Sequence, residues 1–187
     1  MPLRCRNVVV AIGFVAWSTQ ALGTAASPAP SASVIAATAN ARAFASAAAL
    51  NDIYEVQAGQ LALKKAVSMD VRDFAQMMVS DHTETTAKLR RLLATSARDI
   101  LVPMHVDPRH MFMLDDLIAA DGTVFDQRYI AQQLSAHQEA LMVMRTYART
   151  GENGPLKDFA EEAASIVARH VDMITRIDTN HRGISSR

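Results

Sequence analysis

Four polar residues of this 187-residue chain stand where an apolar residue is expected: Glu55, His82, His137 and His170. Each interrupts a stripe of apolar residues that recurs at three- and four-residue steps, which is the spacing of one helix face. Imidazole rings together with a carboxylate suit Zn, Fe, Mn or Cu. The four residues are therefore candidate ligands of one transition-metal ion, provided that the fold brings them to one level.

The elements that must position them are four long helical patterns, separated by breaks near residues 68, 98–121 and 153. Glu55 and His82 lie about 13 residues on either side of the first break, and His137 and His170 lie about 16 and 17 residues from the last one. At ~1.5 Å rise per residue, each candidate falls near the middle of its helix. Two hairpins of similar length then place all four candidates at a common level.

The links between these patterns predict the topology. The links inside each pair are short, whereas residues 98–121 form a long connection with Pro103, Pro108 and a short helix near 111–120. A five-residue resemblance between "VRDFA" and "LKDFA", each opening the second helix of a pair, supports two related hairpins. The prediction is an all-α, ferritin-like up-down four-helix bundle with one long crossover connection. Ser68 or Asp70 is expected to cap the second helix.

Polar neighbours are expected to support the site; they are Asp81, Asp126, Tyr129 and Gln133. Asp81 either orients His82 or faces solvent. Asp126 is favoured as a helix cap, since it has capping-box spacing from Thr123. Tyr129 is favoured as core packing with a hydrogen-bonded hydroxyl. Valines at 79 and 167 replace the glutamates of a di-iron bundle, so a mononuclear site is predicted.

Two other interpretations of these polar residues stay open. In the first, Glu55 and the three histidines only hydrogen-bond to one another and their neighbours, forming a buried network that fixes the packing. In the second, soft ligands in the connection bind copper instead; these are Met104, His105, His110, Met111 and Met113. Met is also an ordinary core filler, so packing is the favoured role of this second set.

Composition narrows the function classes. The chain has no Gly-rich phosphate loop, no Gly-x-Ser-x-Gly and no His-Glu-x-x-His motif, so nucleotide binding and hydrolysis are not supported, and no haem signature is present. No basic block stands out, which argues against a nucleic-acid partner.

Residues 1–26 are expected to be a signal peptide, cleaved near Gly23 to Ala26, followed by a Ser/Ala/Pro-rich linker over 27–40. Export to a bacterial periplasm removes Cys5, leaving no thiol and no membrane-spanning segment in the mature chain.

Four segments resemble the helices of a known family: "YEVQAGQLALKKA", "VRDFAQMMVSDHTETTAKLRRL", "FDQRYIAQQLSAHQEAL" and "FAEEAASIVARHVDMI". They are similar to the bacterial exported family called domain of unknown function 4142, whose fold is a ferritin-like bundle. The resemblance covers about residues 41–180 and implies a bundle domain over 41–182. It carries over to eight positions: Glu55, Asp81, His82, Phe125, Asp126, Tyr129, His137 and His170. One departure is Ala136, where the family pattern has Asp before the histidine.

The sequence thus favours a periplasmic helical bundle that binds one transition metal and has a role in envelope stress. No reaction is assigned, and a non-catalytic role is favoured; an enzymatic role would be that of a metal-dependent oxidoreductase. The rival class is a structural or interaction module in which the Glu/His cluster is only a hydrogen-bonded network. An unknown envelope partner and a homo-oligomer are both compatible with the sequence.

Overall fold

The computed structural model describes residues 41–151 and 154–185, and all of its regular structure there is helical. The expected signal peptide and linker lie outside the described residues. Helix α2 spans Ala41–Lys65, and α3 spans Met69–Ser96. Helix α4 spans Pro108–Ile118, α5 spans Gly122–Thr150 and α6 spans Pro155–Ser185. The all-α prediction is confirmed, and the long helices match the periodic segments to within a few residues.

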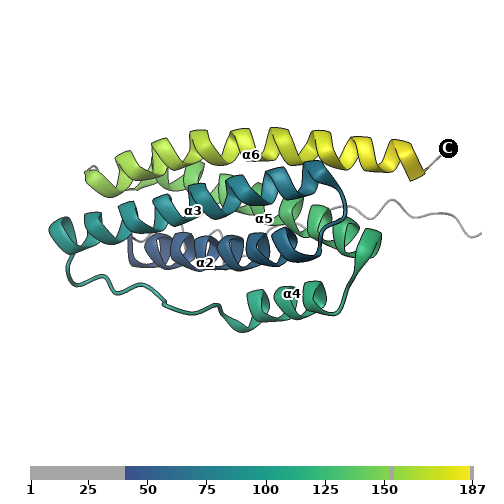
Figure 1. Ribbon diagram of the computed structural model, residues 1–187. Helices are drawn as coiled ribbons and strands as arrows, with labels where there is room; N and C mark the ends of the chain where they lie inside the picture. Colours follow the sequence, from purple (N-terminus) through teal and green to yellow (C-terminus); the bar gives the residue numbers. More distant parts are fainter. Residues whose placement is uncertain (1–40, 152–153, 186–187) are drawn as a thin grey trace, which may run out of the picture.

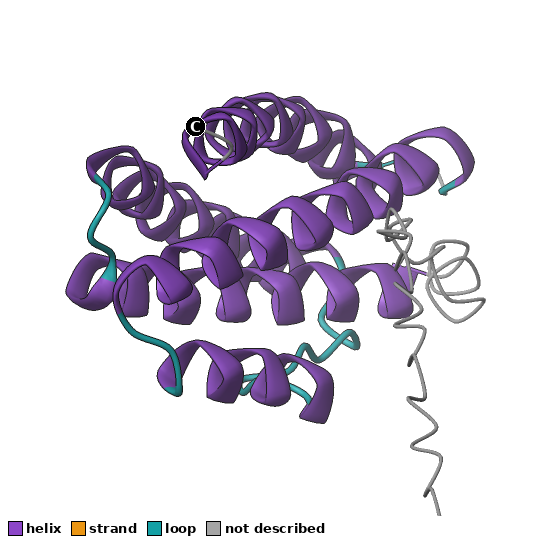
Figure 2. Ribbon diagram, turned by 90° about the vertical axis from the view of Figure 1, so that its right-hand side faces the viewer, coloured by secondary structure: helices purple, strands orange, loops and turns teal. Residues whose placement is uncertain are grey.

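The four long helices form two antiparallel hairpins that pack side by side (Figure 1). Helices α2 and α3 are the first hairpin and α5 and α6 are the second; between the hairpins, α2 packs on α5 and α3 packs on α6. The chain crosses from α3 to α5 along the outside of the bundle, where α4 packs against α2 and α5 (Figure 2). Two hairpins with one long crossover are the topology that the link lengths predict.

Small residues allow the first hairpin to pack closely. Helix α2 buries a run of alanines along its inner face, together with Phe44 and Tyr54. At Gly59 an added Cβ would lie 2.8 Å from the Val79 side chain and 3.1 Å from the Ala75 carbonyl oxygen. The two backbones therefore approach at Gly59, four residues after Glu55, because this position has no side chain.

The capping prediction for Asp126 is wrong, whereas Ser68 is the N-cap residue of α3, one of the two residues predicted for that role. Asp126 does not cap its own helix: its carboxylate accepts hydrogen bonds from the backbone N–H groups of Val67 and Ser68, at 3.2 and 2.9 Å. These donors belong to the turn before α3, where Ser68 is the N-cap residue but makes no side-chain capping bond. The N-cap residue of α5 is Asp121. Asp126 therefore fastens the second hairpin to the end of the first, and it lies about 16 Å along α5 from His137.

Candidate metal centre

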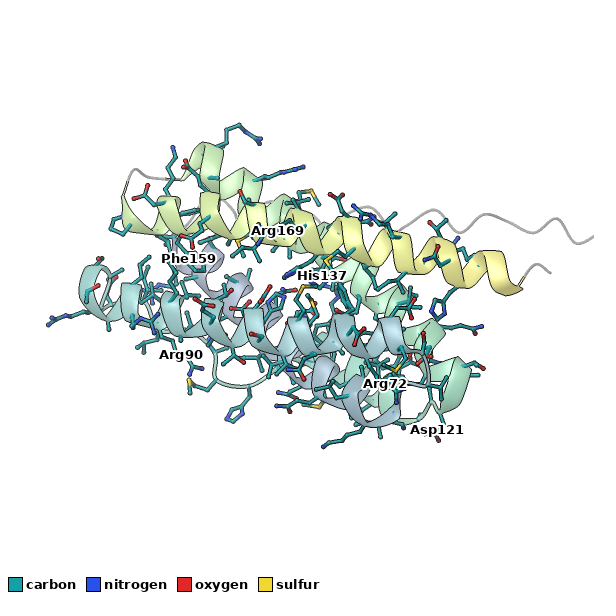
Figure 3. All side chains as sticks on the ribbon, turned by 45° about the horizontal axis from the view of Figure 1, so that its top comes forward. Arg72, Arg90, Asp121, His137, Phe159 and Arg169 are labelled. Atoms are coloured by element: carbon teal, nitrogen blue, oxygen red, sulfur yellow. The ribbon has the colours of Figure 1, made fainter. Side chains whose placement is uncertain are left out.

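Three histidines meet at the centre of the bundle, one from each of α3, α5 and α6. His82, His137 and His170 each offer a ring nitrogen, and these nitrogens lie within 4.8 Å of one another. The ring centroids are 5.3 to 5.6 Å apart. Figure 3 shows His137 near the middle of the bundle, between α3 and α6. All three residues are buried, and the side chain of His137 is 0 % exposed.

Each ring is held from outside by one hydrogen bond. His82 Nδ1 lies 2.8 Å from Asp52 Oδ1. His137 Nδ1 lies 2.9 Å from the backbone carbonyl oxygen of Gln133. His170 Nε2 lies 3.0 Å from Asp81 Oδ2. In each pair the oxygen is the acceptor, so the neutral form of each ring carries its proton on that nitrogen and presents a lone pair on the other.

The second nitrogen of each ring has no hydrogen-bond partner among the described residues; these atoms are His82 Nε2, His137 Nε2 and His170 Nδ1. Each ring offers one nitrogen within 4.8 Å of those of the other two rings, and the unpartnered nitrogen of each ring is the candidate ligand atom. A buried acceptor without a partner costs about 1–3 kcal/mol. Three such atoms at one point are what a three-imidazole metal site leaves when its ion is taken away.

The distances are compatible with such a site. Nitrogens bound to one ion at about 2.0–2.1 Å lie roughly 3.3 Å from one another in tetrahedral geometry. Starting from separations within 4.8 Å, the rings need to approach by at most about 1.5 Å. Small rotations of the side chains about their χ angles supply that movement.

Glu55 lies beside the three histidines but is not part of their group. Its Oε1 lies 3.6 Å from His137 Nδ1, which is too long for a hydrogen bond. Both carboxylate oxygens are buried without a partner in the described part of the chain. Burial raises the pKa of Glu55 to about 7, an effect that His82 partly offsets. The structure therefore brings together three of the four predicted ligands and leaves the fourth next to one of them.

The protonation of the three rings differs because their partners differ. Burial lowers the pKa of His137 well below its usual value, and His82 and His170 lower it further. Burial also lowers the pKa of His170 to about 4, although Asp81 opposes the shift. At His82 burial lowers the pKa, but the carboxylates of Asp52, Glu55 and Asp81 together outweigh this, and the net pKa is raised. His137 and His170 are therefore neutral at neutral pH, the form that binds a metal.

The supporting residues take partly different roles from those predicted. Asp81 holds His170 instead of His82. The partner of His82 is Asp52, which the sequence analysis missed; its other oxygen accepts a hydrogen bond from Thr86 at 3.1 Å. The signal that could have found it is its position one turn before Glu55 on a buried face. Phe74 was also missed; its ring packs against Tyr129, His137 and His170.

Tyr129 and Gln133 lie next to Glu55 in a small polar region of the core. The Tyr129 hydroxyl and both side-chain atoms of Gln133 are buried, with no hydrogen-bond partner in the ranges that the structure describes. The expected partner of the Tyr129 hydroxyl is therefore not found there. Burial raises the pKa of Tyr129 well above its usual value, and the Glu55 charge adds to this. Gln133 contributes its backbone carbonyl, which holds His137.

Two residues of the predicted copper-binding set in the connection, His110 and Met104, take other partners. His110 is buried, and its ring centroid lies 5.1 Å from that of Tyr54. It is not part of the three-histidine cluster. Its Nδ1 lies 2.9 Å from Asp107 Oδ1. The Met104 sulfur, which is exposed, lies 3.4 Å from an Arg90 guanidinium nitrogen. The structure thus directs His110 into the core and Met104 to the surface.

A profile of known families matches residues 25–177 as a domain of unknown function, DUF4142. The chain belongs to the DUF4142 family. No curated protein matches the chain. Among solved structures it is similar to CopM in the Cu(II)-bound form, with a TM-score of 0.64 and 17 % identity, covering 75 % of this chain and 96 % of that one. At this identity the likeness concerns the fold alone.

One departure from the family pattern has a structural counterpart. The family resemblance leads us to expect Asp directly before the histidine of the third long helix, and this DUF4142 chain has Ala136 there, which is buried. The outer nitrogen of His137 is already bound by the Gln133 carbonyl oxygen. The histidine is therefore oriented by the backbone of its own helix and needs no carboxylate at position 136.

None of the described helices is long and apolar enough to cross a membrane.

Proposed function

We propose that this DUF4142 protein binds one transition-metal ion through His82, His137 and His170. The observation that carries the proposal is the pairing pattern: each ring has its outer nitrogen bound and its inner nitrogen unpartnered. Carboxylates or backbone carbonyls commonly hold a metal-binding histidine in this way, since they fix the ring and raise its basicity. Glu55 is the proposed fourth ligand, because both of its buried carboxylate oxygens have no partner in the described residues. Its Oε1 lies 3.6 Å from His137 Nδ1, so the side chain would have to turn toward the unpartnered nitrogens to reach an ion.

The rival hypothesis, a buried hydrogen-bonded network, predicts a different pattern of hydrogen bonds for the same residues. A structural network would satisfy Glu55 and the three histidines through hydrogen bonds to one another and to neighbouring groups. Three neighbour bonds are present, but both Glu55 oxygens and one nitrogen of each ring have no partner in the described part of the chain. Within the described residues no hydrogen bond joins any two of these four, and their bonds run outward to Asp52, Asp81 and Gln133. This pattern favours an ion as the missing partner.

Copper is the first metal to test. Three imidazoles suit Cu, Zn, Fe or Ni, so the ligand set alone does not choose among them. The structurally similar CopM is described in a Cu(II)-bound form, which supports copper as the first choice here. The bound ion would supply a positive charge to the Glu55 region and join the two hairpins. We further propose that the protein is exported and handles metal in the bacterial envelope.

The test is the metal content of protein purified from the periplasm without chelator, measured by mass spectrometry, followed by titration of metal-free protein with Cu(II). We expect near-stoichiometric binding in the wild type, and its loss in His137→Ala and in His170→Gln. His105→Ala is the matched control, since His105 is exposed in the connection. Folded wild-type protein that binds none of Cu, Zn, Fe or Mn would refute the proposal. Loss of copper in His105→Ala alone would move the site to the connection.

A further inference from the structure

The three ring-holding groups differ in their access to solvent. The Gln133 carbonyl lies inside the bundle, and the Asp52 side chain is 2 % exposed. The Asp81 side chain is 33 % exposed, while the His170 ring that it holds is 1 % exposed. A single hydrogen bond therefore connects the buried His170 ring of the cluster to Asp81, a side chain in contact with solvent.

Asp81 also lines a surface pocket of about 180 Å³ between α3 and α6. The charged residues around this pocket are Asp81, Glu84, Lys88, Glu162 and Arg169. Lys88 forms an ion pair with Glu162, so these two charges largely cancel. The two remaining carboxylates face one guanidinium, which leaves the pocket with an excess of negative charge. Figure 3 shows Arg169 on α6, near His137 in that view.

A second pocket, of about 320 Å³, opens between α2 and α3 and reaches Asp52. It is less suited to a cation for two reasons. Arg90 lines it and balances the charge of Asp52. Asp52 also accepts two hydrogen bonds, from His82 and from Thr86, so two bonds must break before this route opens.

Resting on the proposed function, we propose that metal ions reach the three-histidine site through the Asp81 pocket, and that His170 is the gate. Breaking the bond between His170 and Asp81 frees the ring to rotate, which opens the centre toward the pocket. The pocket carboxylates raise the local concentration of divalent cations there, as charged clefts do for their ligands. His137 and His82 stay in place, because their holding bonds lie within one helix and within one hairpin.

The experiment measures Cu(II) loading and release by stopped-flow absorbance at low ionic strength. Glu84→Gln removes one negative charge from the Asp81 pocket. We expect the association rate constant to fall by ~3-fold or more, because the route loses part of its attraction for a divalent ion. The dissociation rate constant falls by the same factor and Kd stays unchanged, since the charge acts on the path and does not touch the bound ion. High salt should shrink the difference.

Two control variants change the charge by the same amount elsewhere. Gln57→Lys adds one positive charge to the Asp52 pocket, and Glu161→Gln removes one negative charge from the exposed face of α6. Both should load at the wild-type rate. Slower loading in Gln57→Lys than in Glu84→Gln would overturn the route, as would equal rates in all variants. A wild type that binds no Cu(II) at equilibrium would instead refute the proposed function, and the route with it.

Discussion

The buried carboxylate of Glu55 makes the metal-free protein sensitive to pH. The side chain is 0 % exposed, and neither oxygen has a hydrogen-bond partner in the described ranges. Burial raises its pKa from 4.5 to about 7. In the unfolded chain the same group ionises at its ordinary value. Between these two pKa values the folded state therefore binds a proton that the unfolded state has released.

The pKa shift gives the size and sign of the effect. A shift from 4.5 to about 7 corresponds to roughly 3 kcal/mol at about 1.4 kcal/mol per unit. Because the folded pKa is the higher one, the stabilisation is fully present below pH 4.5 and is lost as the pH rises through about 7. Above that value the folded protein carries a buried, unpartnered charge.

Glu55→Gln removes the ionisation while keeping the shape of the side chain. We expect the free energy of unfolding of the variant, relative to wild type, to increase by about 3 kcal/mol between acid and mildly alkaline pH. Chemical denaturation followed by circular dichroism, with chelator present, measures this difference at each pH. Titrations of the histidines occur in both proteins, so they largely cancel. Glu161→Gln, an exposed change on α6, is the control and should show no such trend.

Parallel pH profiles for wild type and Glu55→Gln would refute this reasoning, since they would mean that the carboxylate is equally well solvated in both states. Added Cu(II) should reverse the order of the two proteins. With the ion bound, an ionised Glu55 stabilises the complex, so Glu55→Gln should bind copper more weakly while its metal-free form is the more stable one. Unchanged copper affinity in this variant would exclude Glu55 as a ligand.

Three further predictions concern the same core. Asp52→Asn and Asp81→Asn should each raise the Kd for Cu(II) by about 10- to 100-fold in chelator-competition titrations, with the larger effect at the buried Asp52. A Kd equal to that of wild type in both variants would contradict the role of these carboxylates. In the Glu55→Gln background, Kd should rise about tenfold per pH unit below the pKa of His82, since the other two rings are already neutral; a steeper slope would show that they also compete with protons. Gly59→Ala should lower Tm, because its Cβ meets the Val79 side chain and the Ala75 carbonyl oxygen. It should lower Tm less in a Val79→Ala background, where only the backbone contact remains; stabilisation in wild type would refute the close contact.

Most of the fold could be predicted from the sequence because its signals are local. Apolar residues at three- and four-residue steps mark the long helices, and Pro155 marks the start of α6. The common level of the histidines also follows from local geometry: helix rise is constant, so residues equally far from their turns meet. The meeting of His82, His137 and His170 follows from this common level together with their place on the inward-facing stripes, whereas Glu55, at the same level, stays outside the group.

The partners of the histidines could not be predicted in the same way. Whether Asp81 holds His82 or His170 depends on how far each helix is rotated about its axis, and a rotation of a few tens of degrees exchanges the two. Asp126 illustrates the same limit. Its carboxylate accepts hydrogen bonds from backbone N–H groups of the other hairpin and does not cap its own helix. Sequence periodicity identifies the face of a helix, but it does not fix which atom that face meets.

The three ring-holding bonds connect the site to the architecture. The bond to His137 lies within α5, and the bond to His82 lies within the first hairpin. Only the bond between Asp81 and His170 joins the two hairpins, and it is also the one exposed to solvent. An ion held by histidines from both hairpins would therefore act as a cross-link between them. At free metal 1,000-fold above Kd it would add about 4 kcal/mol to stability, so the ion would join the two hairpins at the same place as the bond between Asp81 and His170.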